Sequence, residues 1–288
     1  MFRYILVPAP GDANDDAVFR TAVALVRPAA GHLQFLHVRP DPQQLLIAMS
    51  AGDYGGGTAI GELLDALQRD IDSRQDRARH TVQAFCADQQ IALADQPRSE
   101  TPTATFRVAT GNEARMLTMY ARTADLTVLG RTSEQQPSMM QALEALLLES
   151  GRPLLLAPAQ PPAHIGRHIA IGWKDTAEAA RAVAVVMPLV GTAQSVTVIA
   201  VQETPPGNTA SAERLCHVLQ WHNPAATLRI VAVEGGDTGE TLLSAAADCG
   251  ADLLVLGGYS HSRLREVVFG GVTRHVLHSA LLPVLMAH

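Results

Sequence analysis

The sequence predicts an α/β protein built from two consecutive, doubly wound parallel sheets of five strands each. Three observations lead to this prediction. The chain has 288 residues, which is enough for two domains of ordinary size. One segment occurs twice, and in each half short apolar runs alternate with helical patterns. Alternation of strand and helix implies right-handed βαβ crossovers, which build a parallel sheet covered by helices.

The repeat is clearest in a seven-residue segment that ends in glycine. The stretch Ala124-Asp125-Leu126-Thr127-Val128-Leu129-Gly130 recurs as Ala251-Asp252-Leu253-Leu254-Val255-Leu256-Gly257. Two prolines at 161–162 disfavour helix between the copies and predict a short, stiff linker. We therefore expect two copies of one unit, at residues 1–158 and 164–288. The first copy is degenerate and is lengthened by an insertion at 40–61.

Apolar runs predict ten strands, five in each half. In the first half they lie near residues 3–8, 32–38, 105–109, 125–130 and 153–157, and in the second half near 167–172, 195–201, 227–233, 252–257 and 283–287. Several of these runs are nearly continuous leucine or β-branched residues, as expected for parallel strands that are covered on both faces.

Helical spacing fills the intervals between the strands. Apolar residues recur at spacings of three, four and seven from Ile60 to Phe85, which marks one face of a long helix. Further helices are expected over residues 112–123 and 238–248, each directly before one copy of the repeated segment.

Composition narrows the class of protein. Hydrophobic residues make up 47 % of the chain and charged residues 17 %, which excludes disorder as its general state. A net charge of −6 argues against a nucleic-acid partner, and no apolar run approaches the ~20 residues of a membrane span. The three cysteines are scattered without metal-binding spacing, which favours a reduced compartment. We expect a cytoplasmic protein with no metal site of its own.

The glycine-rich segment after the second copy of the repeat is the main candidate site. Gly257 and Gly258 follow a predicted strand, and Gly270 and Gly271 open the last helix. Glycines after a strand let the backbone approach a ligand closely. The free N–H groups and the positive dipole end of a helix suit phosphate. The segment can therefore cradle a triphosphate, or its glycines can simply make tight turns.

Several features together resemble the universal stress protein family: the tandem repeat, the glycine loop and the closing apolar strand with Pro283. The resemblance covers nearly the whole chain. It implies two Rossmann-like, adenine nucleotide alpha hydrolase-like domains in tandem, each with a five-stranded parallel sheet and two helices on each face. Many members dimerise through the last strand. A tandem chain would then be an intramolecular pseudo-dimer, and two such chains could pair further as a homodimer.

Family members that bind ATP carry Gly-x2-Gly-x9-Gly-[Ser/Thr] after the fourth strand. Gly257 and Gly270 match the first and third glycines, whereas Ser260 replaces the second glycine and Gly271 replaces the hydroxyl residue. Lys174 aligns with an acidic position at the end of the first strand. The resemblance implies a site for one adenine nucleotide, such as ATP, with magnesium only as its companion. Its candidate residues are Gly257, Gly258, Ser260, His261, Gly270, Gly271, Val272, Trp173 and Lys174.

The first half departs further from the nucleotide-binding pattern. Gly130 is followed by Leu143 where the pattern has its third glycine, and proline stands at the acidic position in Pro8-Ala9-Pro10-Gly11-Asp12. Proline also lacks an N–H donor, so we expect no nucleotide site in this half. The insertion contains three consecutive glycines at 55–57. It is expected to be a flexible excursion or, alternatively, to cover a pocket or a partner surface.

Catalysis finds little support in the sequence. It contains no nucleophile elbow, P-loop or dinucleotide fingerprint, so no catalytic residue is assigned. The eleven histidines lack zinc-ligand spacing. We expect a stress-response or regulatory protein, not an enzyme, that binds one adenine nucleotide in its second half. Two alternatives remain open: a protein-interaction module that binds an unknown protein partner and no nucleotide, and a slow ATPase.

Overall fold

The computed structural model describes residues 1–12, 14–42, 57–96, 100–131, 137–202, 209–233, 237–258 and 271–288. Within these ranges the strands are β1 (Tyr4–Pro8), β2 (His32–Arg39), β3 (Ala92–Leu93), β4 (Thr103–Thr110), β5 (Leu126–Leu129), β6 (Leu154–Leu156), β7 (His168–Gly172), β8 (Ser195–Gln202), β9 (Ala226–Ala232), β10 (Leu253–Gly257) and β11 (Val284–Ala287). The α-helices are α1 (Asp15–Val26), α3 (Gly57–Asp88), α4 (Glu113–Ala121), α5 (Pro137–Glu149), α6 (Ala177–Val190), α7 (Ala210–Gln220), α8 (Thr238–Asp248) and α9 (Gly271–Ser279), and η1 (Arg27–Ala29) is a 3-10 helix.

The predicted α/β fold is confirmed, and a strand lies at each of the ten expected places. The first half has one further strand, β3, at the outer edge of its sheet. This strand is only two residues long, too short to leave a periodic pattern in the sequence. The predicted helices are confirmed as α3, α4 and α8.

The two halves share one continuous sheet, with the strand order β3-β4-β2-β1-β5-β6-β11-β10-β7-β8-β9. Strands within each half pair in parallel, whereas β6 and β11 pair antiparallel, with Leu155 opposite Leu285. The closing strands of the two copies therefore meet as they would in a dimer. Because this central pair is antiparallel, the carboxyl ends of the first-half strands and those of the second-half strands lie at opposite edges of the sheet.

Each face of the sheet carries one core that runs through both halves. Side chains from α1, α3, α6 and α7 pack on one face, and side chains from α4, α5, α8 and α9 pack on the other. Leu155 and Leu285 belong to the first core and Leu156 and Met286 to the second. The junction between the halves is therefore apolar on both sides and as dry as the interior of either half.

The aspartate of the repeated segment fastens the fourth principal strand of each half to the first. Asp125 accepts hydrogen bonds from the N–H groups of Arg3 and Tyr4 at 2.8 and 2.9 Å. Asp252 accepts from those of Gly166, Arg167 and His168 at 2.8–3.1 Å. These N–H groups lie at the starts of β1 and β7. An aspartate therefore makes the same link between two neighbouring strands in both copies.

The glycine that ends the repeated segment makes room for the first helix of each half. A Cβ atom on Gly257 would lie 2.4 Å from the backbone nitrogen of Ala179 in α6. A Cβ atom on Gly130 would lie 3.1 Å from a methyl group of Val18 in α1. Sheet and helix thus approach so closely at Gly257 that this position needs glycine whether or not a ligand binds, and the contact at Gly130 is tight.

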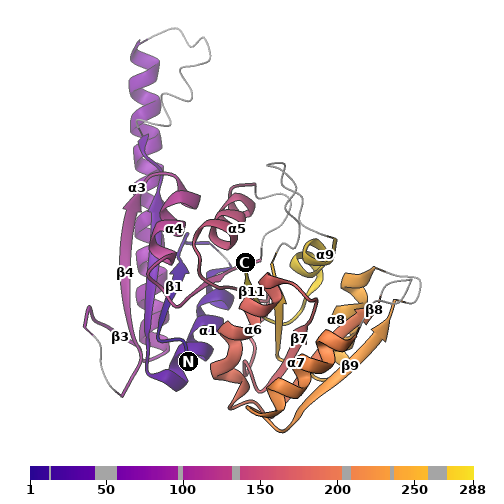
Figure 1. Ribbon diagram of the computed structural model, residues 1–288. Helices are drawn as coiled ribbons and strands as arrows, with labels where there is room; N and C mark the ends of the chain where they lie inside the picture. Colours follow the sequence, from indigo (N-terminus) through magenta and orange to yellow (C-terminus); the bar gives the residue numbers. More distant parts are fainter. Residues whose placement is uncertain are drawn as a thin grey trace.

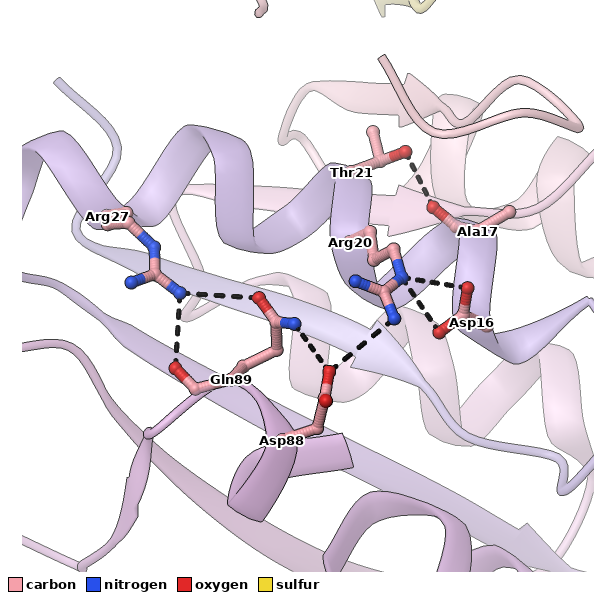
Figure 2. A network of polar contacts seen from close by, with 7 residues as sticks. All are labelled: Asp16, Ala17, Arg20, Thr21, Arg27, Asp88 and Gln89. Carbon is pink, nitrogen blue, oxygen red and sulfur yellow. Dashed lines mark hydrogen bonds and ion pairs between the residues drawn. The ribbon is translucent and has the colours of Figure 1, made fainter. Parts of the chain in front are cut away.

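The long helix α3 has 32 residues, about 48 Å at 1.5 Å per residue, and its amino-terminal part projects beyond the rest of the chain (Figure 1). Its carboxyl end is fastened to α1 and η1 by the polar network of Figure 2. Arg20 lies between Asp16, at 2.9 Å, and Asp88, at 3.5 Å, and Arg27 donates to the carbonyl of Gln89 at 3.2 Å. The network is exposed, so it orients the helices more than it stabilises them.

Candidate functional site

The second-half candidate site lies at the carboxyl edge of its strands, where β7 and β10 end and α6, α8 and α9 begin. In open α/β sheets this edge is where ligands bind. Three of the predicted site residues, Ser260, His261 and Gly270, lie outside the described residues. The other six can be placed one by one.

Gly257 and Gly258 both take part in packing at this edge. Gly257 is required by the approach of α6, as described above. A Cβ atom on Gly258 would lie 2.8 Å from the side chain of Leu147, which belongs to α5 of the first half. The N–H of Gly258 donates to the carbonyl of Ala287 at 2.8 Å. Gly258 is therefore a contact between the two halves, and its amide is already used.

Trp173 and Lys174, which follow β7, differ in their surroundings. The half-buried indole of Trp173 packs against the core and donates through Nε1 to the hydroxyl of Ser211 at 3.2 Å. Its backbone N–H donates to the carbonyl of Ile199. Lys174 is exposed. Trp173 is thus a support for the edge.

Gly271 and Val272 begin α9. A Cβ atom on Gly271 would meet nothing within 4 Å among the described residues, and Gly271 is exposed. Val272 is half-buried and packs against the core, which fixes the first turn in place. The ring of His275 contacts the carboxylate of Asp237 at 3.0 Å. Asp237 in turn caps α8 by accepting the N–H of Gly239, so the two helix starts are held side by side.

The described residues contain no group of three or more His, Cys, Asp or Glu side chains arranged to hold a metal ion. No helix in the described ranges is both long and apolar enough to cross a membrane.

The first half contains a cleft that sequence reasoning missed. Its volume is about 420 Å³, and it lies where β1, β2 and β4 end and α4 begins. His37 and Glu113 are the titratable groups of most interest in its lining. A search for polar residues at the carboxyl end of each predicted strand would have found both. His37 ends the apolar run at 32–38, and Glu113 opens the helix after the strand at 105–109.

Carboxylates crowd this edge of the first half. Burial raises the pKa of Asp15 to about 7, and the nearby charge of Asp12 acts in the same direction. Burial also raises the pKa of Glu113, again with Asp12 adding to the effect. Burial lowers the pKa of His37, so its ring is neutral at neutral pH. Several carboxyl groups therefore lie at this edge, and burial makes those of Asp15 and Glu113 easier to protonate.

The fold defines a tandem α/β protein with two Rossmann-like halves. Residues 167–288 match the model of the universal stress protein family. The complete chain also has the fold of solved universal stress proteins, since both halves are covered by one such structure.

That structure is a universal stress protein from Archaeoglobus fulgidus, with 12 % identity and a TM-score of 0.64 over 99 % of this chain and 96 % of its own. A protein of unknown function from Pseudomonas aeruginosa PAO1 has 16 % identity and a TM-score of 0.56 over 99 % of this chain and 92 % of its own. A universal stress protein in complex with cAMP matches 55 % of this chain with a TM-score of 0.30, too slight a likeness to transfer its ligand. The comparison with curated proteins found no match.

Proposed function

We propose that the chain is a non-enzymatic stress-response protein of the cytoplasm whose second half binds one adenine nucleotide. The observation that supports this most directly is Gly271, the first residue of α9, which is exposed and has no described neighbour where a Cβ atom would lie. The first N–H groups of a helix and its positive dipole end attract phosphate, and the exposed Lys174 adds a positive charge at the same edge. On this proposal residues 1–158 and 164–288 are separate domains, of which only the second is the nucleotide site.

Thermal unfolding of the full chain with ATP, ADP and AMP tests the proposal. A nucleotide present at 100 times its Kd should add about 2.7 kcal/mol to the free energy of unfolding. Gly271→Glu should abolish this shift, because its carboxylate would occupy the approach to α9 and repel phosphate. A matched control is Gly191→Glu at the carboxyl end of α6, where a Cβ atom also meets nothing within 4 Å. Absence of a shift in the parent protein at millimolar nucleotide would end the proposal.

The same two variants test slow ATP hydrolysis. Phosphate release that is lost in Gly271→Glu and kept in Gly191→Glu would belong to this site, and the protein would then be a slow ATPase. Equal release from all three proteins would come from a contaminant.

A second candidate function, a protein-interaction module, is favoured by a different observation. Val218 in α7 is 53 % exposed, and Trp221, the residue that follows this helix, is 81 % exposed. The helix packs beside β9, the outer strand of the sheet. Exposed tryptophan is common at protein contacts and rare elsewhere on surfaces. If this surface makes a homodimer, Trp221→Ser should shift the sedimentation coefficient toward the monomer. Leu281→Ser, at a position 89 % exposed outside α7 and β9, should leave it unchanged.

A further inference from the structure

The cleft of the first half has the size and the place of a ligand site. At about 420 Å³ it falls within the range of small-molecule sites, roughly 300–1,000 Å³. The buried side chains of Leu36, Ile71 and Leu117 form part of its lining. These walls offer an apolar surface to the body of a ligand. The polar groups around them decide which kind of ligand fits.

The cleft is poor in hydrogen-bond donors. Three of its lining residues, Pro8, Pro10 and Pro40, have no N–H group. Of the other backbone amides there, that of Ala9 donates to the carbonyl of Leu36 and that of Gly111 to the carbonyl of Arg39, both at 2.9 Å. An anion needs donors that point at it, and the amides of Ala9 and Gly111 are already used.

The start of α4, which would otherwise attract an anion, is already compensated. The side chain of Asn112 accepts the N–H of Arg115 at 3.0 Å and caps the helix. Glu113 places a negative charge in the first turn, where a carboxylate interacts favourably with the helix dipole. Arg74 also lines the cleft, but its guanidinium is paired with Asp70 at 2.8 Å.

Acceptors, by contrast, face the cleft. His37 lines it and is only 4 % exposed. Its Nδ1 lies 2.9 Å from the carbonyl oxygen of Ala9. A carbonyl can only accept, so Nδ1 carries the proton, and Nε2 of the neutral ring is an acceptor. This Nε2 has no hydrogen-bond partner within the described ranges, so it is free to accept a hydrogen bond from a ligand.

Glu113 supplies a negative charge in the lining of the cleft. Its carboxylate is half-buried, lines the cleft and has no cationic partner among the residues that the structure describes. A buried charge without a partner is costly, and a ligand that brings a positive charge removes that cost. Asp41, at the end of the β2 segment, is a second acid in the lining.

We propose that this cleft binds a small organic ammonium compound, an amine that carries an apolar body. The ammonium group pairs with Glu113 and donates to His37, while the apolar body packs on the side chains of Leu36, Ile71 and Leu117. The site is independent of the proposed nucleotide site, which lies in the other half and at the opposite edge of the sheet.

Isothermal titration of the full chain with tryptamine at pH 8 tests the proposal, with indole-3-propionate as an anionic probe built on the same ring. Tryptamine should bind once per chain, and indole-3-propionate should bind at least tenfold more weakly. The affinity for tryptamine should fall as the pH is lowered from 8, because burial raises the pKa of Glu113 and its carboxylate takes up a proton more readily. The amine itself stays charged throughout this range.

Two variants place the binding in the cleft. Glu113→Gln should weaken tryptamine at least tenfold. Glu144→Gln, in α5 and outside the cleft, should not change it, although burial raises the pKa of Glu144 as well. Circular dichroism establishes that both variants are folded. Tryptamine that does not bind at millimolar concentration, that binds Glu113→Gln as tightly as the parent, or that binds no better than the anion would overturn the proposal. The ATP-induced thermal shift tests the nucleotide site of the second half. It therefore distinguishes a failure of that proposal from a failure of the amine site in the first half.

Discussion

Replacing Asp15 by asparagine should make the protein more stable at alkaline pH and remove a pH dependence from its unfolding. Asp15 is the first residue of α1 and is only 3 % exposed. Its carboxylate accepts the N–H of Gly11 at 3.0 Å, yet burial and the charge of Asp12 raise its pKa from 3.8 to about 7. Asparagine has nearly the same shape, can still accept this hydrogen bond and carries no charge.

The size of this effect on the free energy of unfolding follows from the linkage between protonation and folding. The pKa of Asp15 is raised in the folded state, so its protonation favours folding. This contribution is fully present below pH 3.8 and is lost as the pH rises through 7. From 3.8 to about 7 it amounts to about 4 kcal/mol, since one pKa unit corresponds to 1.36 kcal/mol. Between pH 5 and pH 8 the parent protein should lose about 2.7 kcal/mol relative to Asp15→Asn.

Urea unfolding followed by circular dichroism, at pH 5 and at pH 8, measures this difference directly. Every other titrating group is common to the two proteins, so the change in their stability difference belongs to Asp15. Asp16→Asn is a matched control, because Asp16 is the next residue and its side chain is 61 % exposed in a surface pair with Arg20. It should cost at most about 0.5 kcal/mol at both pH values. If Asp15→Asn differed from the parent equally at pH 5 and pH 8, the reasoning would be refuted.

Three further predictions concern the sheet. Thr127→Val should stabilise the protein by about 1 kcal/mol in urea unfolding, because the buried hydroxyl of Thr127 has no partner within the described part of the chain; a loss of stability would mean that the hydroxyl is bonded. Asp252→Ala should cost more stability in the same assay than Asp125→Ala, because Asp252 accepts three backbone N–H groups and Asp125 two; an equal or reversed order would contradict this account of the repeat. Leu155→Ala in β6, where the side chain is fully buried, should cost roughly 2–5 kcal/mol. It should also lower the urea midpoint of tryptophan fluorescence, although both tryptophans lie in the second half; an unchanged fluorescence midpoint would show that the halves unfold separately.

The repeated segment shows how far the sequence predicts this fold. Its two copies locate one strand in each half, and the apolar runs around them locate the others, because a buried parallel strand needs a continuous apolar run. The pairing of β6 with β11 has no such local cause. It depends on two short strands, of three residues in β6 and four in β11. Their apolar runs would fit a parallel neighbour equally well. The family resemblance, and not the pattern, led to the expected pseudo-dimer.

The candidate sites are less predictable, because a motif records both packing and binding. The motif includes Gly257 and Gly258. In the structure Gly257 packs closely against Ala179 and Gly258 against Leu147, so packing alone explains both glycines. The cleft around His37 has no motif at all. Its volume arises from how three strand ends and two helices fit together, and its acceptor character depends on which amides the fold has already used. Neither property can be predicted from spacing along the chain.

The antiparallel junction also determines how the two halves can communicate. A ligand in one half cannot touch a ligand in the other, because the two carboxyl edges lie on opposite sides of the sheet. The helix α9, however, reaches from one edge to the other. It begins at Gly271, in the proposed nucleotide site, and near its end the carbonyl of His278 accepts a hydrogen bond at 3.3 Å from Arg131, which follows β5 at the first-half edge. The guanidinium of Arg131 is half-buried, and a cation at a helix carboxyl end interacts favourably with the dipole. The helix thus connects Gly271 at one edge with Arg131 at the other. Two identical sites in a homodimer would have to share one chemistry, whereas the two halves of a fused chain can carry different side chains at their two edges.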